Sequence, residues 1–106
     1  MSTRATIAIC RTTGDYLATY LHFDGYPEHA GRLLESNYLS YEQAEALIAK
    51  GDIRCLDADL GEPEYYDAEA PAAVLPTRIA LVEFARNCSS QYLYIFDAGE
   101  WTYQKL

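Results

Sequence analysis

The feature that most constrains the fold is a pair of apolar segments joined by a four-residue turn. Residues 5–11, ATIAICR, are apolar and β-branched, and residues 16–23, YLATYLHF, alternate in character. Such segments are typical of strands, in which successive side chains point to opposite faces. Residues 12–15, TTGD, have the composition of a turn. The N-terminal part of the chain therefore predicts a hairpin.

Two helices are predicted next. Pro27 stands where a helix can begin, because the first turn does not need its missing N–H, and apolar residues then recur at helical spacing over 27–38. Ser40 and Gln43 have the spacing of a capping box. That motif starts a second helix, which Gly51 is placed to close.

The second half of the chain predicts a mixture of elements. Residues 53–61 contain a short strand, and the acid- and proline-rich residues 62–76 predict an irregular loop. The segment from Thr77 favours a helix, although its β-branched and aromatic residues also suit a strand. Residues 91–97 and 101–106 predict a closing hairpin. We expect one α+β domain over 1–106, an antiparallel sheet of two hairpins with two or three helices packed on one face.

Tyrosine is unusually frequent, with ten copies in 106 residues. The strand alternation predicts a sheet face without helices that carries aromatic side chains, namely Tyr16, Tyr20, His22, Tyr92 and Tyr94. Such a face could be ordinary strand composition, a contact surface for a protein or a second copy of the chain, or a platform for stacking bases. The acidity of the chain disfavours the last of these.

The charge is negative and unevenly distributed. The formal net charge is −8, and the segment Gly51–Ala70 holds seven acids against one base, Arg54. Direct binding of nucleic acid is disfavoured, because its affinity depends on Lys and Arg releasing counterions. A basic protein is the expected partner, since a negative field speeds encounters with basic surfaces.

Cysteine usage and hydropathy bear on the compartment. Cys10, Cys55 and Cys88 are odd in number and widely spaced within apolar stretches, which is typical of buried thiols in a reducing compartment. No apolar run approaches the length of a membrane span, and the N-terminus lacks the pattern of a signal peptide. We expect a cytoplasmic protein.

One short segment, HFDGYPEH, concentrates reactive side chains. His22, Asp24, Glu28 and His29 have the donor atoms of a metal site, but their spacing does not match the common helical pairs. His22 and Asp24 could instead share a strand face for acid–base chemistry, although Asp before Gly is also ordinary turn composition. We predict no catalytic residues, no metal and no cofactor. A small enzyme or ligand-binding protein centred on His22, Asp24, Tyr26 and Glu28 is the alternative.

Two segments resemble a known family. The N-terminal pattern is Ser-Thr-Arg followed by Tyr-x-His-aromatic-Asp-Gly-Tyr-Pro-Glu and a glycine, and the C-terminal one is YLYIFDAGEWTY. Both are similar to small, mostly uncharacterised proteins of phages and other mobile elements, which more often carry Trp where this chain has Phe23. The matching N-terminal positions are Ser2, Thr3, Arg4, Tyr20, His22, Phe23, Asp24, Gly25, Tyr26, Pro27, Glu28 and Gly31.

The resemblance implies a setting and no activity. Small acidic phage proteins are often stoichiometric inhibitors of host defence, anti-CRISPR proteins among them, and some imitate the charge pattern of DNA. The resemblance and the charge together predict a non-enzymatic inhibitor in the host cytosol that binds a basic nucleic-acid-handling complex. The residues expected to contact that partner are Asp57, Asp59, Glu62, Glu64, Tyr65, Tyr66, Asp67 and Glu69.

Overall fold

The computed structural model describes residues 3–56, 63–66 and 71–106. These residues form seven strands, three α-helices and one π-helical turn, η1. The strands are β1 (Ala5–Cys10), β2 (Tyr16–Leu21), β3 (Ile53–Leu56), β4 (Pro63–Tyr65), β5 (Ala73–Leu75), β6 (Tyr92–Asp97) and β7 (Glu100–Lys105). The helical elements are η1 (Pro27–Gly31), α1 (Arg32–Asn37), α2 (Tyr41–Ala49) and α3 (Arg78–Asn87).

All seven strands belong to one mixed sheet. Its order is β4-β3-β2-β1-β6-β7, and β5 pairs with β2 as well. The pairs β1–β2 and β6–β7 are antiparallel hairpins, but β1 joins β6 in parallel, and β2 joins β3 in parallel. The predicted fold class, an antiparallel sheet of two hairpins, is therefore wrong, although the fold is still α+β.

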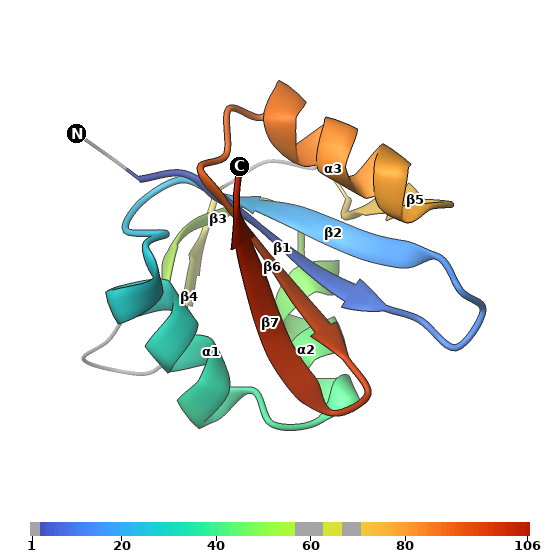
Figure 1. The fold of residues 1–106 in the computed structure, drawn as a ribbon. Helices are drawn as coiled ribbons and strands as arrows, with labels where there is room; N and C mark the ends of the chain where they lie inside the picture. The colour runs from blue at the N-terminus through green and yellow to red at the C-terminus, as the bar shows by residue number, and fades with distance from the viewer. Residues whose placement is uncertain (1–2, 57–62, 67–70) are drawn as a thin grey trace.

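The helices cover both faces of the sheet, which corrects the expectation of one covered face. α3 lies on one side, and α1 and α2 lie on the other (Figure 1). The central strands explain this arrangement, because β1 is buried at Ala5 through Ile9 and β6 at Leu93 through Phe96. Near-continuous apolar strands of this kind are typical of a sheet that is covered twice.

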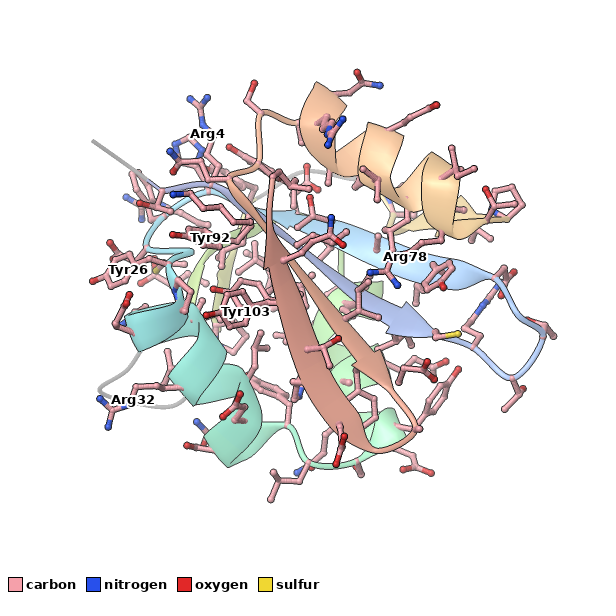
Figure 2. All side chains as sticks on the ribbon, in the orientation of Figure 1. Arg4, Tyr26, Arg32, Arg78, Tyr92 and Tyr103 are labelled. Carbon is pink, nitrogen blue, oxygen red and sulfur yellow. The ribbon has the colours of Figure 1, made fainter. Side chains whose placement is uncertain are left out.

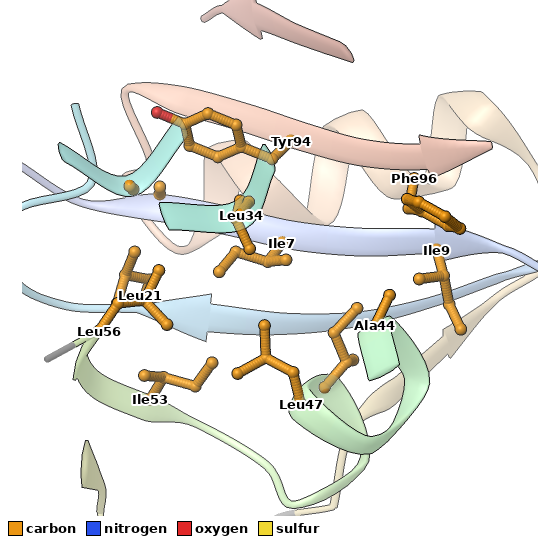
Figure 3. Close-up of a cluster of buried hydrophobic side chains, with 13 residues drawn as sticks. Ile7, Ile9, Leu21, Leu34, Ala44, Leu47, Ile53, Leu56, Tyr94 and Phe96 are labelled. Atoms are coloured by element: carbon orange, nitrogen blue, oxygen red, sulfur yellow. The ribbon is translucent and has the colours of Figure 1, made fainter. Parts of the chain in front are cut away.

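The larger part of the core lies on the face of α1 and α2. Ile7, Leu21, Leu34, Ile48 and Tyr94 are fully buried there, as Figure 3 shows for most of them. A smaller cluster lies beneath α3, where Leu81 and Ala85 pack against the small side chains of the sheet and against Leu93 and Ile95.

The capping box at the start of α2 is confirmed. The Ser40 hydroxyl accepts a hydrogen bond from the Gln43 N–H at 3.1 Å, and the Gln43 side chain accepts one from the Ser40 N–H at 3.2 Å. The helix predicted from Thr77 is also confirmed, because the Thr77 hydroxyl accepts a bond from the N–H of Ala80. The helix predicted over 27–38 is divided into η1 and α1.

The predicted irregular loop over 62–76 is wrong in part. Two three-residue strands, β4 and β5, lie within it and pair with β3 and β2. Residues 62 and 67–70 of this loop lie outside the described residues. Short edge strands carry little periodicity, so the proline and acid content dominated the prediction.

The turn at Asp24-Gly25 depends on close packing. Asp24 carries the positive φ of 56°, whereas Gly25 is buried against the start of β1. A Cβ added to Gly25 would lie 2.7 Å from the Cβ of Ala5 and 2.8 Å from the Thr3 carbonyl oxygen. The close approach to β1 therefore explains the glycine.

The predicted tyrosine face does not form. Register places Tyr94 beside Ile7, and Ile7 beside Thr19, so Tyr94 shares a face with Thr19 and not with Tyr20. Tyr16 packs in the α3 cluster, whereas Tyr92 and Tyr94 belong to the opposite face. Self-association through one continuous tyrosine face is therefore not available to this fold.

Candidate functional site

Only part of the predicted partner-binding set is described. Glu64 and Tyr65 belong to β4, at one edge of the sheet, and Tyr66 follows them. The other five predicted residues lie outside the described residues, namely Asp57, Asp59, Glu62, Asp67 and Glu69.

Glu64 is paired within the chain. An Nη1 atom of Arg54 lies 3.1 Å from an Oε2 atom of Glu64, and both side chains are about half exposed. An exposed ion pair of this kind contributes about 0–1 kcal/mol to stability. The pair engages the single base of the segment Gly51–Ala70.

Tyr65 and Tyr66 differ in their surroundings. The Tyr65 hydroxyl donates a hydrogen bond to the Leu47 carbonyl at 2.6 Å, and burial raises its pKa to about 12. Tyr65 therefore joins β4 to α2 within the chain, and its role as a partner contact stays a prediction. Tyr66 is 37% exposed, and its ring meets the His22 ring edge-on at 5.9 Å, so Tyr66 is free to touch a partner.

The reactive side chains of HFDGYPEH do not converge. β2 ends at Leu21, so His22 and Asp24 no longer share a strand face. The Nδ1 atom of His22 lies 2.7 Å from the Tyr20 hydroxyl, whereas Nε2 of His29 lies 3.1 Å from the Leu56 carbonyl oxygen. Asp24 and Glu28 are exposed. In the part of the chain that the structure describes, no group of three or more His, Cys, Asp or Glu residues could hold a metal ion.

Three tyrosines form an aromatic cluster on the sheet face that α1 and α2 cover, and Tyr94 is its buried member. The rings of Tyr92, Tyr94 and Tyr103 lie 5.7 to 6.4 Å apart. Figure 2 labels Tyr92 and Tyr103 of this cluster, together with Tyr26, the residue before η1. The Tyr94 ring lies against η1, because a Cβ added to Gly31 would be 3.5 Å from its Cε1 atom. The Tyr94 hydroxyl donates a hydrogen bond to the Gly25 carbonyl at 2.6 Å, so the cluster anchors the Asp24-Gly25 turn to β6.

A hollow of about 410 Å³ lies between α3 and the sheet. It opens on the face where Tyr20 and Ala18 of β2 point toward α3. Its described lining is Ala18, Tyr20, Asp52, Pro71, Ala73, Phe84 and Cys88. Ala18 and Tyr20 belong to β2, and Asp52 lies just before β3. Ala73 belongs to β5 and Pro71 to the segment before it, and Phe84 and Cys88 belong to the C-terminal half of α3 and its C-cap.

Three polar side chains line this pocket. Burial raises the pKa of the Cys88 thiol, and the Asp52 carboxylate raises it further, so the thiol stays protonated at neutral pH. Burial also raises the pKa of the Tyr20 phenol, against the opposing effect of the Arg4 guanidinium. Among the described residues, no base forms an ion pair with Asp52.

Few features of the sequence indicate this pocket. In the sequence, Asp52 is one of the seven acids of Gly51–Ala70, and Phe84 is one of the aromatic residues after Thr77 that also suit a strand. The pocket forms where α3 covers the face that was predicted to carry no helix. The parallel pairing of β1 with β6 was not predicted either. The sequence signal for the pocket is the small size of two of its lining residues, Ala18 in β2 and Ala73 in β5.

Comparisons with known proteins supply no relative. The chain matches no protein-family model, no curated protein and no solved structure. No helix of the described residues has the length and apolar character that a membrane crossing requires.

Proposed function

We propose that the protein is a non-enzymatic inhibitor that binds a basic, nucleic-acid-handling protein complex of a host cell. It acts as an acidic binding surface in the host cytosol and needs no cofactor. The observation that carries this proposal is the concentration of unopposed negative charge on the two sides of β4 in the sequence.

Charge counting supports the proposal. Residues 57–62 hold three acids, residues 67–70 hold two, and neither stretch holds a base. These ten residues thus carry five of the eight net negative charges of the chain. Arg54 is already engaged by Glu64, so the segment Gly51–Ala70 has no second base with which to neutralise the others.

Carboxylates can replace phosphates in this role. A carboxylate offers the Arg guanidinium two oxygens in the geometry that a phosphate offers, so a basic groove made for nucleic acid accepts both. Asp57, Asp59, Glu62, Asp67 and Glu69 supply the charge. Tyr66 adds an exposed aromatic ring beside them in sequence, and aromatic residues are enriched at the centres of interfaces.

The host-defence setting of the proposal rests on the sequence resemblance to phage and mobile-element proteins. The physical part, a charge-led contact with a basic protein, rests on the charge distribution alone. The two parts can therefore fail separately.

A pull-down from host lysate tests the physical part. We expect the tagged protein to capture a basic nucleic-acid-binding protein at low salt and to release it at high salt, because screening weakens contacts between exposed charges. The captured protein should lose its binding of DNA or RNA when the inhibitor is added.

Two triple variants with equal net charge test whether the position of the acidic residues matters for capture. Asp57→Lys, Asp59→Lys and Asp67→Lys together should abolish capture. Glu35→Lys, Glu83→Lys and Glu100→Lys replace three exposed acids elsewhere and should preserve it. Equal loss in both variants, or capture that does not change with salt, would contradict the proposal.

A further inference from the structure

The pocket under α3 has the dimensions and walls of a small-molecule site. Its volume of about 410 Å³ falls within the range of about 300–1,000 Å³ that is typical of such sites. Ala18, Ala73, Pro71 and the Phe84 ring give it apolar walls. A ligand for this pocket therefore has an apolar body.

The polar atoms of the pocket are mainly hydrogen-bond acceptors. The carboxylate of Asp52 accepts only, and no base of the described residues is paired with it. The Tyr20 oxygen lies 2.7 Å from Nδ1 of His22, and a phenol that donates to Nδ1 keeps lone pairs with which to accept another bond. The protonated Cys88 thiol is only a weak donor.

Acceptors in an apolar pocket favour a ligand that donates hydrogen bonds and carries positive charge. A cation at Asp52 compensates a carboxylate that lies next to apolar walls and forms no ion pair with a base of the described residues. The faces of the Tyr20 and Phe84 rings attract cations as well. The net charge of −8 disfavours an anionic ligand in the same place.

We propose that this pocket binds a small organic cation, with its apolar body against Phe84 and Ala18 and its amine nitrogen at the Asp52 carboxylate. Asp52 is not among the predicted partner-binding residues, although its carbonyl oxygen accepts a hydrogen bond from the Tyr66 N–H at 3.1 Å. The proposal does not depend on the inhibitor function. It assigns Asp52 a role that the charge count alone does not show.

Three matched probes test the charge requirement. Binding of 2-phenylethylamine, 2-phenylethanol and phenylacetate is followed by ¹H–¹⁵N NMR of the whole chain. We expect the amine to shift the amide signals of Ala18, Asp52, Ala73 and Cys88 in a saturable manner. The alcohol should bind about tenfold more weakly, because it lacks the charge-assisted hydrogen bond. Phenylacetate should not bind.

Three variants locate the site. Asp52→Asn should weaken binding of the amine about tenfold, and Ala73→Phe, which fills the hollow from an edge strand, should abolish it. Asp97→Asn removes an exposed acid at the end of β6 and should change nothing. If Asp52→Asn does not fold, Ala73→Phe and the three probes still decide the question. Equal binding of amine and alcohol, shifts spread over the acidic surface, or no saturable binding would each overturn the proposal.

Discussion

Replacing Tyr94 by Phe tests the hydrogen bond that ties the Asp24-Gly25 turn to the sheet. The Tyr94 side chain is 1% exposed, and its hydroxyl donates to the Gly25 carbonyl at 2.6 Å. Phe keeps the ring and opens no cavity of side-chain size, but it leaves this carbonyl without its donor. A buried polar group that loses its partner costs about 1–3 kcal/mol, so we expect the free energy of unfolding to fall by that amount.

Urea denaturation followed by fluorescence measures the change, and the dependence of unfolding on urea should stay the same because the exposed surface is unchanged. In thermal melts the midpoint should fall by about 4–8 °C for each kcal/mol lost. Tyr103→Phe is the matched control, since Tyr103 is 55% exposed and lies in the same ring cluster. It should cost less than about 0.5 kcal/mol. If both variants lose the same stability, the reasoning about Gly25 is refuted.

Three further predictions use the same measurements or titrations. Gly25→Ala should destabilise the chain by about 1–3 kcal/mol, because its Cβ would overlap Ala5 and Thr3. Gly31→Ala should be neutral or stabilising, since its Cβ meets nothing closer than 3.5 Å. Equal melting temperatures for the two variants would contradict this prediction. The Arg11 guanidinium holds the pKa of Asp15 at about 2. The stability that Asp15 contributes is therefore complete above its unfolded pKa of about 3.9 and is lost as the pH falls toward 2. A ¹³C titration of Asp15 should show a midpoint at about pH 2, and Arg11→Gln should return that midpoint toward the ordinary value. Burial raises the pKa of Tyr65 to about 12, so its neutral phenol favours the folded state up to about pH 10, and that contribution to stability is lost between pH 10 and 12. In an absorbance titration, Tyr65→Phe should remove one phenol that titrates late. An unchanged titration curve would contradict this prediction.

Local features of the fold could be predicted from the sequence. The hairpin of β1 and β2 and the capping box at Ser40 and Gln43 depend on residues a few positions apart, and alternation and capping report such neighbours directly. The closing hairpin of β6 and β7 is of the same kind.

The wrong predictions depend on contacts between distant residues. Parallel pairing of β1 with β6 joins Ile7 to Tyr94, and no local pattern encodes it. The sequence predicts helices on one face of the sheet only, although the near-continuous apolar character of ATIAIC fits a strand that is covered on two faces. α3 covers the face that carries Tyr16, whereas Tyr94 lies on the face of α1 and α2.

The candidate sites divide in the same way. The acidic segment was visible in the sequence because charge is a property of composition, whereas the role of Tyr65 depends on its contact with Leu47 of α2. The pocket at Asp52 draws its lining from separate elements, so its members share no sequence spacing.

The parallel contact between β1 and β6 also has a consequence for synthesis of the chain. During translation, β1 can pair with β2 almost at once, but its other edge has no neighbour until β6 leaves the ribosome. Until then Ile7 and Ala8 lie in a strand with an open side, which is the type of edge at which nascent chains associate with one another. A chaperone that shields this edge early in synthesis would therefore raise the yield of native protein more than one that acts after release.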